Sequence, residues 1–389
     1  MKRLFLTGAV LLAITATTYA QTNTATISQS GTGHAVDVLQ TGSDQLVTID
    51  QSGSDNSATT EQISVFGQEI AITQSGSDND AFAYQNEQAG PSNLITITQS
   101  GSENFAFADQ SDFFTIGSTA TITQTGTSDE AYIDQAGAVG VVDGAIGSEA
   151  TITQNGVGNG NYAEINQYLS SGDEAVIDQV GEDNFAYINQ TGADNYAEIL
   201  QNSVFGPQVA TINQDGIDNY AQIKQQDNAG PDNYATINQM GDGNQAYIDQ
   251  SDFFTINATA TITQDGNDNF GLIWQYGAID SEATITQTGN NNTAGVGQYD
   301  GFDNFVSITQ TGNNNFTGVE QTGSGNSATI VQEGDFHNAV SGLPLLVPNI
   351  QQYGNDNTLM LTQTGTAGLV VVDQIGNNNS ATIMQNNNP

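Results

Sequence analysis

A glutamine that returns about every eleven residues is the feature that most constrains this chain. The series starts at Gln29, includes Gln351 and ends at Gln385, which gives 30 glutamines and 29 intervals. Sixteen intervals are 11 residues long, eleven are 12 to 14, and two are 19. Twenty of the glutamines have a glycine two residues later. Such repetition predicts a stack of similar units, because one unit alone cannot bury its apolar side.

A right-handed coiled coil also has an eleven-residue period, but the sequence argues against a helix. Glycine recurs throughout the repeats and costs a helix about 1 kcal/mol relative to alanine at each position. Intervals of 12 to 14 residues would also rotate an apolar stripe away from its seam.

The residues between the glutamines alternate with the period of a β-strand. In the stretch NFAYINQ (184–190), the first, third, fifth and seventh residues are Asn, Ala, Ile and Gln. This set recurs along the chain, whereas the residues of the other parity vary. Side chains of one parity share a face of a strand, so the recurring set is predicted to face inward. Its amides can donate and accept in continuous ladders. The predicted ladder residues are Gln179, Asn184, Gln190, Asn195, Gln201, Gln214, Asn219, Gln225, Gln239, Gln250, Gln264, Asn269 and Gln275.

The segments between the strands have the composition of tight turns. Glycine allows a positive φ there, and Asn or Asp makes local hydrogen bonds. The predicted turn glycines are Gly181, Gly192, Gly216 and Gly266. Strands and turns together predict an all-β fold: a β-solenoid of about 15 stacked two-strand coils with a cross-β, amyloid-like arrangement.

The two sides of each coil differ in sequence. One class of strand reads Thr-Ile-Thr-Gln, as at 121–124, and the other reads Ala-Tyr-Ile-Asp-Gln, as at 131–135. The two classes mostly alternate, as the two sides of a flattened coil should. The alternation slips between Gln135 and Gln214, where the first 19-residue interval has room for a strand without glutamine.

Composition limits the function. The formal net charge is −40, with 43 acidic and 3 basic residues, and there is no cysteine. Disulfides are therefore excluded, and binding to nucleic acid or anionic lipid is not expected because little positive charge is present to neutralise phosphate. The acidic residues fall mostly in turns and on the variable parity. Repulsion between stacked charges predicts a gatekeeper role that keeps the chain soluble, assigned to Asp183, Asp194, Asp218 and Asp268.

The first 20 residues differ from the rest. A basic start at Lys2 and Arg3, an apolar run and a small residue at Ala20 predict a signal peptide, residues 1–20. The apolar run is too short to span a bilayer, so no membrane insertion is expected. The predicted organisation is a signal peptide, a repeat domain over 21–385 and a C-terminal tail over 386–389.

The pattern Asn-x-Ala-x-Ile-x-Gln-x-Gly-x-x-Asn resembles the curlin repeat of curli fibre subunits, over about residues 23–385. The resemblance implies a secreted structural subunit that polymerises outside the outer membrane into functional amyloid fibres for biofilm matrix and surface adhesion. It also implies end-to-end self-association, a nucleator subunit and an outer-membrane secretion pore as partners. This chain has more repeats and more acidic residues than the usual subunit.

Other functions were weighed against this one. Stacked outward Thr-x-Thr pairs are also found in ice-binding or adhesin-type β-solenoids, and some β-helix proteins are polysaccharide-active enzymes. The sequence contains no phosphate-binding glycine-lysine motif. His34 and His337 each stand alone and are predicted to be loop or surface residues rather than metal ligands. No catalytic residue, metal site or cofactor is therefore predicted, and the question whether acidic turns such as 266–269 bind Ca²⁺ stays open.

Overall fold

The computed structural model describes residues 22–64, 67–86, 92–111, 115–136, 147–203, 206–226, 230–251, 254–340 and 350–387. The predicted signal peptide, residues 1–20, lies outside this part of the chain, and so do residues 137–146 of the first long interval. The regular elements of the described residues are all strands. None of the described residues forms a helix able to cross a membrane.

The chain divides into two compact units. The first unit comprises Met1–Gln179 and Asn189–Ala193, and the second comprises Val180–Ile188 and Asp194–Pro389. Strands β13 (Glu174–Gly181) and β14 (Phe185–Ala193) contribute residues to both units. The following description takes each unit by itself.

The first unit contains twelve complete strands among its described residues. They are β1 (Thr24–Thr32), β2 (Ala35–Gly42), β3 (Leu46–Ser54), β4 (Ser57–Ser64), β5 (Glu69–Ser77), β6 (Asp80–Gln85), β7 (Leu94–Ser102), β8 (Phe105–Asp109), β9 (Thr119–Thr127), β10 (Glu130–Ala136), β11 (Glu149–Asn159) and β12 (Tyr162–Ser171). Odd-numbered strands pair in parallel with odd-numbered strands, and even with even. Six two-strand coils result.

The second unit repeats this plan. Its strands are β15 (Tyr196–Ser203), β16 (Gln208–Ile217), β17 (Tyr220–Gln225), β18 (Asn233–Met240), β19 (Gln245–Asp249), β20 (Thr259–Asp265), β21 (Phe270–Ile279), β22 (Glu282–Thr288), β23 (Thr293–Phe302), β24 (Phe305–Thr311), β25 (Phe316–Thr322), β26 (Ser327–Asp335), β27 (Asn338–Val340), β28 (Ile350–Tyr353), β29 (Thr358–Thr366), β30 (Leu369–Val371), β31 (Asp373–Ile375) and β32 (Ser380–Asn387). The short strands β27 and β28 both pair with β25, and β30 and β31 pair with β27 and β28 respectively. The described strands of this unit form eight coils.

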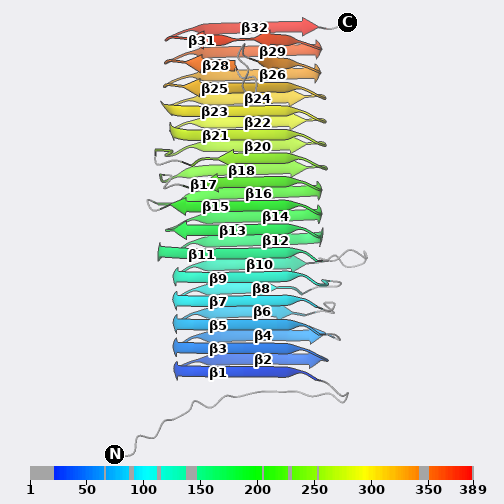
Figure 1. Cartoon of the computed structure of the whole chain (residues 1–389), viewed down its shortest axis with the longest axis vertical. Coiled ribbons are helices and arrows are strands. Elements are labelled where there is room, and N and C mark those ends of the chain that lie inside the picture. The colour runs from blue at the N-terminus through cyan, green and yellow to red at the C-terminus, as the bar shows by residue number, and fades with distance from the viewer. Residues whose placement is uncertain are drawn as a thin grey trace, which may run out of the picture. The chain divides into compact units, whose positions relative to one another are not determined.

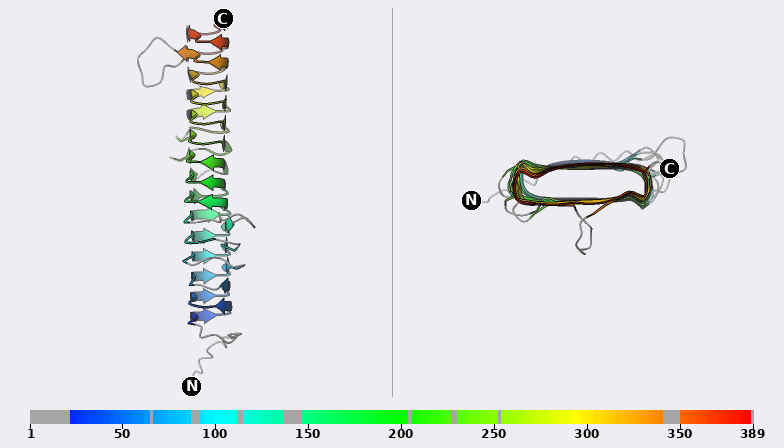
Figure 2. Two further views of the ribbon diagram at one scale, coloured as in Figure 1. Left: turned by 90° about the vertical axis from the view of Figure 1, so that its right-hand side faces the viewer. Right: turned by 90° about the horizontal axis from the view of Figure 1, so that it is seen from above.

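Each coil is a flattened loop whose two long sides are the odd and the even strand (Figures 1 and 2). Equivalent positions of the repeat stand directly above one another. In β20 and β22, for example, Ala260 pairs with Ala283, Ile262 with Ile285, and Gln264 with Gln287. The β-solenoid predicted from the repeat is confirmed, and the number of coils is close to the predicted 15.

The interior is built from the recurring parity, as predicted. In β9, Ala120, Ile122 and Gln124 are fully buried, while the threonines between them are half-buried on the outside. Stacked isoleucines and alanines give each coil an apolar core that its neighbours complete. One glutamine of the series was misplaced by the sequence: β28 pairs Gln352, not Gln351, with Gln321. Adjacent glutamines have opposite parity, and the repeat distinguishes them, because only Gln352 has a glycine two residues later, at Gly354.

The expected slip between Gln135 and Gln214 lies in the sequence classes, not in the strand order. Strand β11 pairs with β9, and β12 pairs with β10, so the alternation of strands continues across the long interval. Four successive strands, β12 to β15, all lack the Thr-Ile-Thr-Gln sequence and belong to the other class, with Ala-x-Ile-x-Gln and no threonine at the variable positions. The threonine class therefore occupies odd strands in the first unit, such as β7 and β9, and even strands in the second, such as β20 and β22.

Candidate functional site

The inward glutamines form ladders that run from coil to coil. Gln214 donates to Gln239 and Gln239 to Gln264, each over 2.9 Å between Nε2 and Oε1. In the first unit, Gln154 donates to Gln179 and Gln167 to Gln190 over the same distance. The same bond joins the remaining predicted residues on odd strands in the order Gln201, Gln225, Gln250 and Gln275. Every predicted ladder glutamine is buried.

Each ladder glutamine also ties the two sides of its coil together. The Nε2 of Gln264 donates to the carbonyl of Gln245 over 3.0 Å, and the Nε2 of Gln250 donates to the carbonyls of Tyr234 and Ala258. These carbonyls lie at or just before the start of strands, and that of Ala258 also accepts from the backbone N–H of Tyr234. The glutamine side chain therefore adds a cross-link between the two sides of the coil to the backbone bonds of the sheet.

Inward asparagines form a second ladder in the turns. Asn219 donates through Nδ2 to Oδ1 of Asn195, Asn244 to Asn219, and Asn269 to Asn244, over 3.0–3.1 Å. Asn184 is fully buried, and its Nδ2 donates to the carbonyl of Val180 over 3.4 Å. The Nδ2 of Asn219 also donates to the carbonyl of Gly241, so this ladder fixes the turn of the next coil.

The two kinds of ladder have opposite directions. In the side-chain bonds that link the inward ladder residues, a glutamine donates to the glutamine of the next coil along the chain, and an asparagine donates to the asparagine of the previous coil. The two ends of a stack are therefore chemically different. A face at the C-terminal end presents glutamine donors and asparagine acceptors, and a face at the N-terminal end presents the reverse.

The predicted turn glycines all have positive φ: 116° for Gly181, 121° for Gly192, 141° for Gly216 and 123° for Gly266. At Gly216 and Gly266 there is also no space for a side chain. A Cβ on Gly266 would lie 2.1 Å from the carbonyl oxygen of Gly289 in the next coil. Glycine is therefore required both by the left-handed backbone and by the close approach of successive turns.

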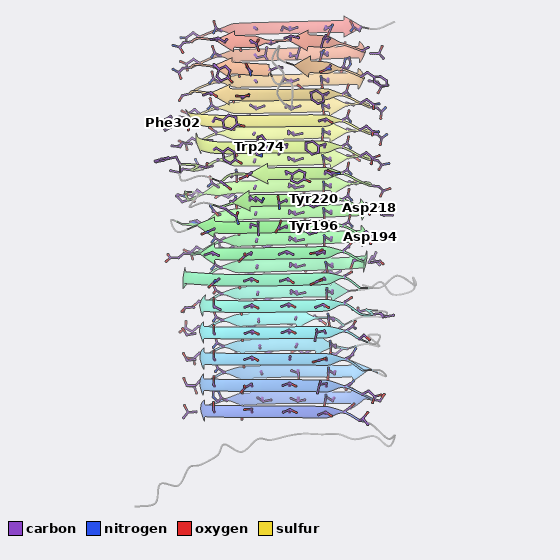
Figure 3. The ribbon with its side chains drawn as sticks, in the orientation of Figure 1. Asp194, Tyr196, Asp218, Tyr220, Trp274 and Phe302 are labelled. Carbon is purple, nitrogen blue, oxygen red and sulfur yellow. The ribbon has the colours of Figure 1, made fainter. Side chains whose placement is uncertain are left out.

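The four predicted gatekeeper aspartates also have an unusual backbone conformation. Asp183, Asp194, Asp218 and Asp268 are exposed and have φ between 53° and 56°. Figure 3 shows Asp194 and Asp218 at the turn edge of neighbouring coils. Aspartate tolerates the left-handed region better than most residues, so this turn favours it independently of charge. Sequence analysis assigned the positive φ to the glycines alone and missed this second position.

Aromatic side chains line the outer face of neighbouring strands (Figure 3). Tyr196 stacks on Tyr220 with ring centroids 4.8 Å apart, and Tyr220 lies 5.2 Å from Tyr247. Such pairs add about 0.5–1.5 kcal/mol beyond area burial. Elsewhere, the Tyr353 hydroxyl donates to a carboxylate oxygen of Glu320 over 2.7 Å. Burial and, after it, this carboxylate raise the pKa of Tyr353 to about 12.

Ladder positions also hold residues that sequence analysis did not assign to them. His337 lies in the turn before β27, as expected for a loop residue, but it is buried and not on the surface. Its backbone N–H donates to Oδ1 of Asn315, and its Nδ1 accepts from the N–H of Gly368. Asp129 and Asp173 are buried at ladder positions too. The signal that would have found them is spacing, since His337 and Asp129 each follow a ladder glutamine by five residues.

In the described part of the chain, no group of three or more His, Asp or Glu side chains is arranged to hold a metal ion. The family model described as "Curlin associated repeat" matches residues 22–53, 90–113, 171–202, 230–252, 280–312, 301–334, 312–340 and 350–386. A search of curated protein sequences finds no match.

Proposed function

Because the matched stretches cover more than half of its 389 residues, the chain belongs to the curlin-repeat family, and we propose that it is a secreted subunit of extracellular curli-like fibres. In this proposal the chain passes through an outer-membrane pore, stacks end to end with other copies outside the cell, and provides biofilm matrix and surface adhesion. The family and the β-solenoid fit a structural subunit rather than an enzyme.

The observation that carries the proposal is the pair of terminal faces. The N-terminal face consists of β1 and β2, and among the described strands these pair only with β3 and β4. The C-terminal face consists of β30, β31 and β32, and β32 pairs only with β29. Each face therefore offers an edge of backbone donors and acceptors to a further strand.

The two faces match in register and in polarity. Val370 of β30, Val372 between the two strands and Gln374 of β31 have the same repeat positions as Ala25, Ile27 and Gln29. On the other side, Gln385 of β32 has the position of Gln40. The ladder direction makes Gln385 Nε2 a donor and Gln40 Oε1 an acceptor. Head-to-tail contact therefore continues both ladders, whereas contact between like faces would oppose donor to donor.

Charge is low where this contact is proposed. Residues 24–42 contain one acidic residue, Asp37, and residues 369–387 contain one, Asp373. Residues 174–195, which include β13 and β14, contain five. Stacked like charges oppose association, so the low charge of the terminal coils favours their contact.

The test is polymerisation of the chain from Gln21 onward. We expect a lag, then fibres in electron micrographs, binding of an amyloid dye and a cross-β reflection near 4.8 Å, with the lag removed by fibre seeds. A folded β-rich chain that stays monomeric at every concentration, with or without seeds, would overturn the proposal.

Ice binding is the second candidate, and one observation favours it. The outward pairs Thr96/Thr98, Thr121/Thr123 and Thr151/Thr153 stand in register on β7, β9 and β11. A flat, regular array of threonines is the surface such a function needs. Thermal hysteresis of the soluble chain would support this function, and its absence together with fibre formation would exclude it.

A further inference from the structure

Asp129 occupies a position that an amide holds in neighbouring coils. In the first unit, the ladder after the odd strands is made of His34, Asn56, Asn79, Asn104, Asp129 and Asn161 in order. Asp129 lies between β9 and β10 and is fully buried. A buried carboxyl group needs a hydrogen-bond partner or a counter-charge for each oxygen, and its surroundings show which it has.

One oxygen of Asp129 behaves as the oxygen of an asparagine does. Its Oδ1 accepts from Asn161 twice, from the backbone N at 3.1 Å and from Nδ2 at 3.0 Å. The backbone N–H of Asp129 donates to Oδ1 of Asn104 over 3.1 Å. Both contacts repeat those of Asn79 and Asn104 one coil earlier. The second oxygen, Oδ2, therefore stands where the other rungs place Nδ2.

That place is built for a donor. In Asn104, Nδ2 donates to Oδ1 of Asn79 at 3.0 Å, to the carbonyl of Ser100 at 3.3 Å and to that of Gly126 at 3.2 Å. The equivalent partners of Asp129 are acceptors as well, beginning with Oδ1 of Asn104. Accordingly, Oδ2 of Asp129 is buried with no hydrogen-bond partner. If the carboxyl group were ionised, Oδ2 would be an acceptor that faces other acceptor oxygens.

The described turns next to Asp129 contain no basic residue to compensate for this arrangement. The acidic groups beside Asp129 are Glu103 in the turn of the previous coil and Glu130, the next residue, both exposed. The turn of the following coil, Gly160–Asn161, carries no charged side chain. Tyr132, further along β10, donates to Glu130 and not to Asp129. Burial is the main cause that raises the pKa of Asp129, while its bonds with Asn161 lower it.

We propose that Asp129 is a proton-controlled rung of the asparagine ladder. A proton taken from solvent onto Oδ2 makes this oxygen a donor to Oδ1 of Asn104, and the ladder from Asn56 to Asn161 becomes continuous. Loss of that proton leaves two facing oxygens and breaks the ladder between Asn104 and Asp129. The inference concerns the fold of one chain, so it stands whether or not the chain forms fibres.

The direction of the pH effect follows from the raised pKa. The stabilisation is complete below the pKa of the unfolded chain, 3.8, and is lost as the pH rises through the higher pKa of the folded chain. Acidification of a neutral solution therefore closes the ladder and strengthens the first unit. An exterior acidic residue has no such rung to complete.

The experiment compares Asp129→Asn with Asp78→Asn in the full chain. Asp78 is exposed with φ of 56°, so its change removes the same charge from a turn that asparagine tolerates. Hydrogen exchange at the amides of Asp129 and Asn161 is measured between about pH 4 and pH 8. In the parent chain, protection should rise about five-fold as the pH falls, the worth of one hydrogen bond in the ladder. Asp129→Asn should show the high protection at every pH, and Asp78→Asn should behave as the parent chain does.

A second variant moves the switch. Adding Asn104→Asp to Asp129→Asn should restore the pH dependence, now with the break between Asn79 and residue 104. Infrared absorption of a protonated, buried carboxylic acid should be present in the parent chain at mildly acid pH and absent from Asp129→Asn. Equal pH profiles for the parent chain and Asp129→Asn, or the absence of that carboxylic acid band, would overturn the proposal.

Discussion

Replacing the last ladder glutamine, Gln385→Leu, should leave the folded chain nearly unchanged and weaken its polymerisation. In the single chain Gln385 is half-buried, and its one ladder bond is accepted from Gln363 over 2.9 Å. Gln287 in the middle of the second unit is the reference. It accepts from Gln264, donates to Gln310 over 2.9 Å and donates to the carbonyl of Phe270 over 3.0 Å.

The contacts set the expected magnitudes. Gln287→Leu removes three buried hydrogen bonds and leaves their partners unsatisfied, so it should cost about 3–5 kcal/mol of unfolding free energy. Gln385→Leu loses one half-exposed bond, about 1 kcal/mol. In a head-to-tail joint, however, Gln385 becomes an internal rung that donates to Gln40 of the next copy. A lost bond and a buried, unsatisfied oxygen cost the joint about 2 kcal/mol, or on the order of 30-fold in the critical concentration.

The assay is urea unfolding of the soluble chain together with the concentration of monomer left at the end of polymerisation. Thr382→Leu, which changes the outward face of the same strand, is the control and should alter neither by more than a few-fold. If Gln385→Leu polymerises as the parent chain does, the C-terminal face is not the joint. If it destabilises the single chain as much as Gln287→Leu, that face is not open.

Three further predictions concern individual side chains or pairs of side chains. Thr60→Val should raise the unfolding free energy by about 1 kcal/mol in urea titrations, because the Thr60 hydroxyl is buried without a hydrogen-bond partner; a loss of stability would contradict this. Asp194→Asn combined with Asp218→Asn keeps the left-handed turns and removes two exposed charges. The double change should shorten the lag of fibre formation and make the lag less sensitive to salt or Ca²⁺. An unchanged lag would contradict the gatekeeper role. The phenol of Tyr353 should titrate near pH 12 by ultraviolet absorption, because burial and then Glu320 raise its pKa. The stability it contributes should be complete below about pH 10 and be lost as the pH rises through about 12. Glu320→Gln should lower this pKa, and an unchanged pKa would contradict the contribution of Glu320.

The inward half of the fold could be read from the sequence because it repeats. Asn, Ala, Ile and Gln recur at fixed parity, and a one-residue shift would turn the whole set outward, so the register has little freedom. The glycine of each turn was equally readable, since few other residues fit its conformation. Position 351 was wrongly assigned although the signal was present: only Gln352 has a glycine two residues later, and the pairing with β25 confirms Gln352 as the inward residue.

The ladder substitutions could not be found by residue type. A lone histidine and a lone aspartate are usually solvated, and nothing in their own chemistry places His337 or Asp129 inside. Burial arises because the neighbouring coils force position five after a ladder glutamine to face inward, whatever residue stands there. Tertiary register therefore overrides the polarity of the individual side chain. Counting residues from the glutamine predicts burial better than hydropathy does in this fold.

The threonine-rich class can move from odd to even strands because the outward residues of a strand vary independently of its inward residues. Odd and even strands present the same Ala, Ile and Gln to the interior, so the core does not distinguish a threonine-rich outer face from an aromatic or acidic one. The outer face can then change side along the chain while the strand order stays intact, as it does from β12 to β15. Exterior charge is therefore expected to act on the proposed assembly more than on the fold. Asp129 reverses that relation, because it is a titratable group within the ladder, where a proton acts directly on the fold.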